Sequence, residues 1–398
     1  MSHVAPPRLT YSGPALFSMG FRPFFLLAGL FGALAVPLWI AVFAGHVTLA
    51  GPFDPVDWHV HEMLFGYAGA VLAGFLFTAV PNWTGRMPAR GAPLAALAAL
   101  WLAGRLAVAG LLGLGPVAAM AVDGGFLLAI AAMIAVEIVA GRNWRNLKVV
   151  VPVTLLALSN LAFHLGAMTG LGTGAPRQAG FALLLFLVML IGGRIVPSFT
   201  RNWRAAQRLE RMPVPFNRFD AASLAVAGLA LVLWVVLPRT SATGVAMIAA
   251  GALHLVRMAR WRGLAAWRAP LLLMLHVAYG ALALGLGLAG LAAFGALAPA
   301  TGYHLLGIGG IGGMTIAVMM RAAMGHTGRT LQAGRLLTIA FLLVMAAALV
   351  RVTAGYSMTA LGLAATLWAA GFALFCLRVG PWLARPNRQR RRPSGPAR

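Results

Sequence analysis

Residues 59–81 read HVHEMLFGYAGAVLAGFLFTAVP, and this stretch decides the fold class. It contains one acidic residue, Glu62, and neither lysine nor arginine. A predominantly apolar run of roughly 20 residues is the length that an α-helix needs to cross the hydrocarbon core of a bilayer. We therefore predict that this stretch is a transmembrane helix whose first turn carries two histidines.

Similar apolar runs recur along the whole chain. The chain is 61% hydrophobic and 10% charged, whereas a soluble domain carries about 25% charged residues. We predict an all-α polytopic membrane protein with about twelve transmembrane helices. The run 243–256 is short, so either its ends lie in the loops or it does not cross fully. The other expected helices are 24–44, 93–113, 116–139, 147–168, 178–196, 221–237, 270–290, 304–324, 334–353 and 359–379.

The basic residues alternate with the predicted helices. They gather in every second loop, and the opposite loops hold only Arg177, Arg239 and Arg351. Because basic loops stay on the cytoplasmic side, both termini are predicted to be cytoplasmic, in the inner membrane of a bacterium. The net charge of +24 is assigned to contact with lipid headgroups rather than with nucleic acid. The expected parts are a cytoplasmic segment (1–23), one transmembrane domain (24–380) and a basic, disordered cytoplasmic tail (381–398).

Two segments of the chain resemble each other. His304 follows His61 by 243 residues, and the same offset aligns the Thr-Gly-Arg sequences 84–86 and 327–329. The run 178–196 ends in a Val-Pro sequence that also ends the run 59–81. These runs are four helices apart, which predicts three four-helix units in parallel repeat.

The densest chemistry is the sequence WHVHE at residues 58–62. Imidazole nitrogens suit haem iron and copper. Residues two apart on a helix differ in direction by about 200°, so His59 and His61 can share one metal only if this turn is unwound. Otherwise, one is a ligand and the other faces elsewhere. His59 and Glu62 share a face, as an imidazole oriented by a carboxylate would; equally, these polar residues could cap a helix among headgroups.

The histidines near the predicted helices fall into two tiers. The outer tier is His59, His61, His164 and His304, and the inner tier is His254, His276 and His326. Ionisable groups within a membrane are costly and usually functional. We predict haem or copper ligands among His59, His61 and His304, with His164 as a further candidate. Alternatively, the inner tier around His276 and His326 holds the cofactor, or each leaflet holds one. The glycines of residues 307–313 leave room for a flat macrocycle or for a neighbouring helix.

Arg105 and Asp123 flank the turn at residues 113–116 and are equally distant from Leu114. In an antiparallel helix pair, both lie about 13 Å below the turn. A structural ion pair is therefore predicted, with contact to a haem propionate as the alternative.

Several longer motifs resemble those of the NnrS family. They are residues 20–25 (GFRPFF), 58–67 (WHVHEMLFGY), 74–86 (GFLFTAVPNWTGR), 192–197 (GGRIVP) and the stretch from His304 to the GHTGR sequence at 325–329. The resemblance extends from about residue 17 to residue 380. Members of this family are described as membrane proteins that contain haem and copper and are associated with denitrification and nitric oxide stress. The resemblance therefore implies a nitric oxide-related function and both cofactors.

The sequence bounds the type of cofactor and leaves other function classes open. Cys376 is the single cysteine, and a C-x-x-C-H motif is absent, so the haem would be non-covalent, of b type. The helix count is similar to that of the haem-copper oxidase catalytic subunit, but the adjacent histidine pair that helps to bind copper there is missing. The alternatives are a transporter of a metal or a nitrogen-oxide-related solute, and a membrane oxidoreductase that metabolises nitric oxide.

Overall fold

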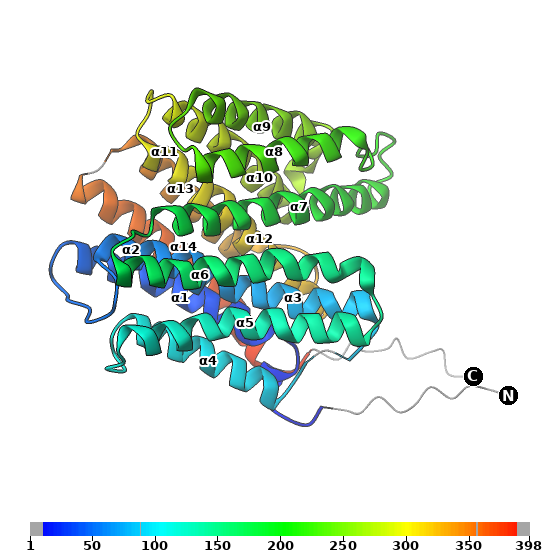
Figure 1. The fold of residues 1–398 in the computed structure, drawn as a ribbon. Helices are drawn as coiled ribbons and strands as arrows, with labels where there is room; N and C mark the ends of the chain where they lie inside the picture. Colours follow the sequence, from blue (N-terminus) through cyan, green and yellow to red (C-terminus); the bar gives the residue numbers. More distant parts are fainter. Residues whose placement is uncertain (1–10, 88, 356, 388–398) are drawn as a thin grey trace.

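The computed structural model describes residues 11–87, 89–355 and 357–387, and every regular element in these ranges is helical (Figure 1). Within this part, eleven helical segments are long and apolar enough to cross a membrane. A further apolar helix, α4 (Ala92–Val108), has 17 residues. The prediction of an all-α polytopic membrane protein is therefore confirmed.

The bounds of the elements follow the predicted apolar runs closely. The other long helices are α1 (Phe21–Phe43), α3 (Ala68–Thr84), α5 (Pro116–Ala140), α6 (Val150–Thr169), α7 (Gly174–Ala206), α8 (Arg218–Val236), α9 (Ser241–Ala259), α10 (Pro270–Ala293), α12 (Gly313–His326), α13 (Gly334–Thr353) and α14 (Met358–Ala384). The short elements are α2 (Pro55–His61), α11 (Pro299–His304), the π-helical η2 (Glu62–Tyr67) and η5 (Leu305–Gly312), and the 3₁₀ turns η1 (Ala15–Phe17), η3 (Trp144–Val149) and η4 (Gly263–Arg268).

Helix ends settle two of the expectations from the sequence. The short run 243–256 lies within α9, which has 19 residues. The helix therefore extends at both ends into residues that the sequence assigned to loops. Helix α14 continues to Ala384, which places the first residues of the expected tail in a helix. Residues 1–10 of the expected N-terminal segment and residues 388–398 of the tail lie outside the described ranges. The sidedness of the bundle stays a prediction.

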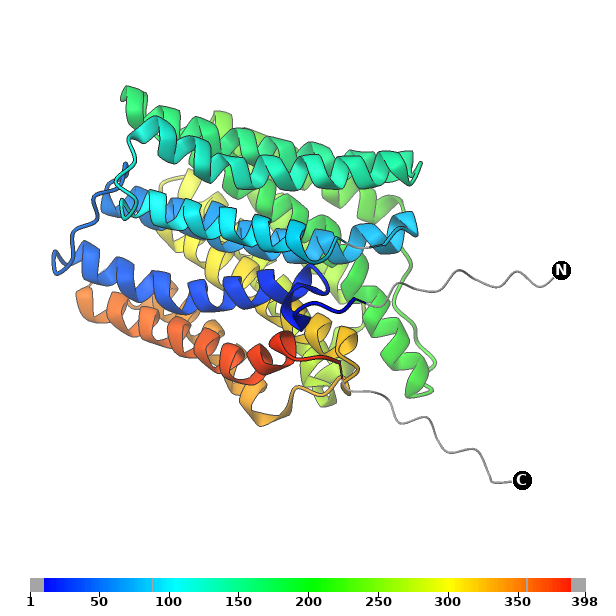
Figure 2. The same ribbon diagram turned by 90° about the horizontal axis from the view of Figure 1, so that it is seen from below.

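The helices lie side by side in one bundle, and the first and last long helices, α1 and α14, are neighbours in it (Figures 1 and 2). Helix α14 packs between α1 and α13. The start of α1 and the end of α14 lie at the same end of the bundle. There, Nη1 of Arg22 donates hydrogen bonds of 2.7 Å to the carbonyls of Leu383 and Arg385. The last carbonyls of a helix lack partners within it, so Arg22 satisfies groups that would otherwise be unpaired.

Two of the spans are interrupted helices inside the bundle. The segment α2–η2–α3 begins with Pro55 and turns π-helical directly after His61, and α11–η5–α12 begins with Pro299 and turns π-helical directly after His304. Turns of π-helix are rare and frequently mark functional sites. The two segments share the same order of elements, as their sequence similarity suggests. Helix α7 is α-helical throughout, and the three-unit repeat stays a prediction.

Candidate cofactor site: a histidine-lined cavity and a buried polar cluster

The two histidines of the WHVHE sequence face different parts of the molecule. Helix α2 is regular as far as His61, and the π-helical turn begins only at Glu62. The directions of His59 and His61 therefore differ by about 200°. His59 lines a cavity, whereas His61 is fully buried in a polar cluster. The two histidines therefore do not share one metal position.

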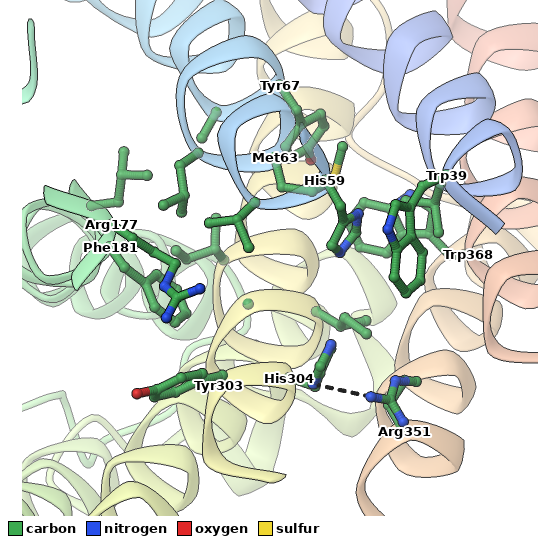
Figure 3. Close-up of a pocket in the computed structure, with 18 of the residues that line it drawn as sticks. Trp39, His59, Met63, Tyr67, Arg177, Phe181, Tyr303, His304, Arg351 and Trp368 are labelled. Carbon is green, nitrogen blue, oxygen red and sulfur yellow. Dashed lines mark hydrogen bonds between the residues drawn. The ribbon is translucent and has the colours of Figure 1, made fainter. Parts of the chain in front are cut away.

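The cavity lies between the two interrupted helices, with α1, α7, α8, α13 and α14 completing its walls (Figure 3). Its volume is about 180 Å³. Most of the wall is apolar, and large parts of it are aromatic. The aromatic residues that line it are Trp39, Tyr67, Phe181, Trp234, Tyr303 and Trp368, and the polar ones with nitrogen-bearing side chains are His59, Arg177, Gln178, His304 and Arg351.

His304 presents a nitrogen with a free lone pair to this cavity. Its Nδ1 lies 2.7 Å from the carbonyl oxygen of Ala300, which can only accept, so Nδ1 carries the proton and donates it. Nη2 of Arg351 lies 3.4 Å from the same nitrogen (Figure 3). Because the contact with the carbonyl of Ala300 is shorter, we assign the proton to Nδ1. The lone pair of a neutral histidine then lies on Nε2, and an imidazole fixed by a hydrogen bond at its other nitrogen is the form that binds metals.

His59 reaches the same cavity from the other interrupted helix (Figure 3). Its ring stacks on Trp39 with a centroid separation of 4.3 Å and an interplanar angle of 26°. Its Nδ1 is buried and has no hydrogen-bond partner among the described residues. A buried nitrogen without a partner is unusual and calls for an explanation such as a ligand. The sequence left open whether Glu62 orients His59 or caps the helix; in the structure, Glu62 contacts His61.

The buried polar cluster joins residues from η2, α4, α5 and α6 to His61. Arg105 donates hydrogen bonds to the carboxylates of Glu62 and Asp123. The pairing of Arg105 with Asp123 is the one that the turn at residues 113–116 predicts. Asn160 on α6 donates from Nδ2 to Oδ2 of Asp123 at 2.8 Å. None of these side chains is more than 5% exposed, so the charges are paired within the protein rather than solvated.

Both ring nitrogens of His61 face acceptors. Nδ1 lies 3.0 Å from Oε1 of Glu62, and Nε2 lies 3.1 Å from Oδ2 of Asp123. An imidazolium donates to both acceptors and, together with Arg105, balances the charges of Glu62 and Asp123. A metal ion bound at Nε2 would replace that proton, because metals bind the neutral imidazole.

The same cluster has the composition of a metal site. One ligand atom from each of His61, Asp123 and His164 lies within 4.8 Å of the other two. Nε2 of His164 is 3.1 Å from Oδ2 of Asp123, and its buried Nδ1 has no hydrogen-bond partner in the described residues. Imidazole nitrogen suits copper, zinc and iron. In the described part of the chain, this is the one group of three histidine, cysteine or acidic side chains close enough to share a metal ion.

The inner histidines are not brought together. Nδ1 of His254 lies 2.6 Å from the hydroxyl of Tyr279. His276 donates from Nε2 to the hydroxyl of Thr200 at 2.9 Å, since that hydroxyl donates to the carbonyl of Val196. The ring of His326 packs 5.2 Å from that of Phe21. Each has its own neighbours, and the ligand roles considered for His276 and His326 stay predictions.

Sequence reasoning missed the two arginines of the cavity, although a signal for them was present. Arg177 and Arg351 are two of the three basic residues in the loops that are otherwise poor in positive charge. Both line the cavity. A basic residue on the side that the positive-inside rule disfavours is therefore a pointer to function.

Fold and site together define a polytopic helical membrane protein that holds groups able to bind metal inside its bundle. The chain belongs to the NnrS family: the family model described as NnrS protein matches residues 15–387. The resemblance found in the sequence motifs is thereby confirmed over nearly the whole chain. No curated protein matches the sequence.

Proposed function

We propose that this NnrS protein binds haem and copper within the membrane and acts in the response to nitric oxide by binding nitric oxide or a related small molecule. Haem is assigned to the cavity between His59 and His304, and copper to the cluster of His61, Asp123 and His164. The observation that carries the proposal is the pair of imidazoles at one aromatic cavity. One of them offers a lone pair on Nε2, and the other has a buried nitrogen without a partner.

The lining of the cavity suits a flat, largely apolar macrocycle with acidic edges. Trp39 and Trp368 supply aromatic surface, and the guanidinium groups of Arg177 and Arg351 line the same space. Arginine pairs with carboxylates in a two-pronged geometry, so these arginines are the groups that would hold haem propionates. His59 or His304 would hold the haem iron, and the haem would supply the chemistry for binding a diatomic ligand.

The donor set of the buried cluster suits copper. Two imidazoles and one carboxylate surround the position, and cysteine ligands are not needed. Glu62 and Arg105 hold His61 and Asp123 in place through hydrogen bonds, as the outer partners of metal ligands do. Copper there supplies a one-electron redox couple.

Transport is the second candidate, and the matching order of elements in α2–η2–α3 and α11–η5–α12 favours it. Many transporter folds are built from structural repeats, with the binding site at the interface between them. The absorption spectrum of the purified protein separates the two functions. A Soret band that shifts with nitric oxide supports the haem protein, whereas a colourless protein that contains no metal supports a transporter.

Substitutions test the two assignments separately. His59→Ala and His304→Ala are expected to lower the haem content, measured by the pyridine haemochrome assay, because each removes a nitrogen that faces the cavity. His61→Gln and His164→Gln are expected to lower copper, measured by elemental analysis. His46→Ala, in an exposed loop, is the matched control and should keep both cofactors.

Folded variants that all keep full haem and copper would contradict both assignments. Loss of haem in His61→Gln alone would instead move the haem to the buried cluster.

A further inference from the structure

A second, smaller cavity lies next to the histidine-lined one. It is enclosed by α3, α7, η5 and α12 and has a volume of about 90 Å³. Its lining is almost entirely apolar. The residues that line this second cavity alone are Val71, Leu72, Phe75, Leu187, Val188, Ile191, Gly192, Ile195, Met314, Thr315 and Val318.

The two cavities meet at a shared wall. Ala68, Leu184 and Ile311 line both of them. Ala68 is the first residue of α3, directly after the π-helical turn, and its methyl group is the smallest side chain of the three. A larger residue at this position would fill the junction. The two cavities are therefore neighbours, separated by these three side chains.

Beside the junction, the hydroxyl groups of Tyr67 and Thr315 both donate hydrogen bonds within the protein. The hydroxyl of Tyr67, which lines the first cavity, lies 2.6 Å from that of Thr315, which lines the second. Thr315 donates to the carbonyl of Gly312 at 3.0 Å, so Tyr67 is the donor to Thr315. An apolar space with its few polar groups already paired stays dry, and burying an ion there would be costly.

The second cavity lies at the depth of the bilayer core. Val188, Ile191 and Val318 line it and are only partly buried. They lie well inside the long spans formed by α7 and α12, where the surface of a membrane protein contacts acyl chains. A route that enters at this depth would admit molecules dissolved in hydrocarbon and exclude hydrated ions.

We propose that the second cavity is the route by which a small uncharged gas molecule passes from the bilayer core to the histidine-lined cavity. This inference rests on the proposed function, which supplies the gas, a diatomic nitrogen oxide, and its destination. At about 90 Å³, the second cavity has room for a diatomic molecule. The passage is apolar, as a gas more soluble in hydrocarbon than in water requires.

Ligand association kinetics test the route in haem-loaded protein in lipid nanodiscs. Val318→Phe at the membrane end and Ala68→Phe at the junction are expected to slow the association of nitric oxide after flash photolysis. The expected reduction is about tenfold or more, within the range over which association rates vary among variants of one site. The matched control is Val232→Phe, a substitution of the same kind on the membrane-facing side of α8, where the side chain is 58% exposed. It should bind at the wild-type rate.

Xenon supplies a readout that does not depend on haem. Xenon under pressure is expected to occupy the second cavity of the wild-type protein and to be displaced in Val318→Phe, which remains informative if Ala68→Phe fails to fold. A colourless protein that still takes up xenon there would refute the proposed function and leave the gas passage standing. Three outcomes would contradict the proposed route. They are wild-type association rates in both variants, slower association in Ala68→Phe alone, and a lipid chain in the cavity in place of xenon.

Discussion

At the scale of single residues, the buried cluster shows how a membrane protein keeps ionised groups in its interior. Arg105 would be costly there alone, since an isolated charge in a medium of low dielectric constant is strongly destabilised. Its guanidinium instead lies between the carboxylates of Glu62 and Asp123, and His61 lies on the other side of both. Removing any one member leaves another with unpaired charge, so these residues act as a unit.

The ion pair leads to a prediction for stability. Asp123→Ala leaves Arg105 with one carboxylate and is expected to destabilise the protein by about 3–5 kcal/mol, the range for a broken buried pair. The further change Arg105→Ala should restore part of the loss, because it removes the positive charge left in excess in the cluster. Thermal unfolding of the purified variants measures both effects.

An exposed ion pair on the same protein provides the control. Arg86 donates to Glu137 at 2.7 Å, and the two side chains are 45% and 30% exposed. Glu137→Ala is expected to cost about 1 kcal/mol or less. Independent, additive losses from Asp123→Ala and Arg105→Ala would show that these two residues are not energetically coupled.

At the scale of elements, the glycines of η5 serve close packing more than they provide space for a ring. A Cβ atom on Gly312 would lie 2.5 Å from the indole of Trp368, and one on Gly310 would lie 3.1 Å from Leu282. Gly307 is the glycine of this segment that lines the cavity. Of the two readings left open by the sequence, helix packing therefore accounts for most of these positions.

This contact predicts an asymmetry between two glycines of the same span, Gly312 and Gly325. Gly312→Ala is expected to destabilise the protein by about 1–3 kcal/mol, as overpacking does, because Trp368 is held by a 2.7 Å hydrogen bond to the carbonyl of Gly32. Since Trp368 also lines the cavity, haem retention should fall with it. Nothing lies within 4 Å of a Cβ on Gly325, so Gly325→Ala should be neutral or slightly stabilising. Thermal unfolding and haem content check both variants, and equal behaviour would contradict the packing argument.

At the scale of the whole molecule, the arrangement of charged loops predicts the orientation. Ala205 lies exposed at the end of α7, and Ala50 lies exposed just before α2. With the native cysteine removed as Cys376→Ser, single cysteines at these two positions should react from opposite sides of the membrane with an impermeant maleimide. Residue 205 is expected to be cytoplasmic. Labelling of both positions from one side would refute the predicted topology.

Much of the fold follows from local sequence, whereas the site does not. Pro116 and Pro270 begin helices at the predicted residues, because proline suits the first turn of a helix. The pairing of Arg105 with Asp123 also follows, since a tight turn fixes the relative depth of two helices. The π-helical turns after His61 and His304 were not predictable, because they depend on how each helix packs.

The contact between Arg22 and the end of α14 has a consequence for how the chain is made. The hydrogen-bonding partners of Arg22 lie up to 365 residues further along the chain. Ribosomes add about 5–20 residues per second, so the first helix waits on the order of tens of seconds for its last neighbour. During that interval, the arginine must rest among headgroups at the membrane surface. Insertion of the final helix then brings α14 beside α1. Because residues of α14 line the cavity, the cavity is complete only when synthesis is complete.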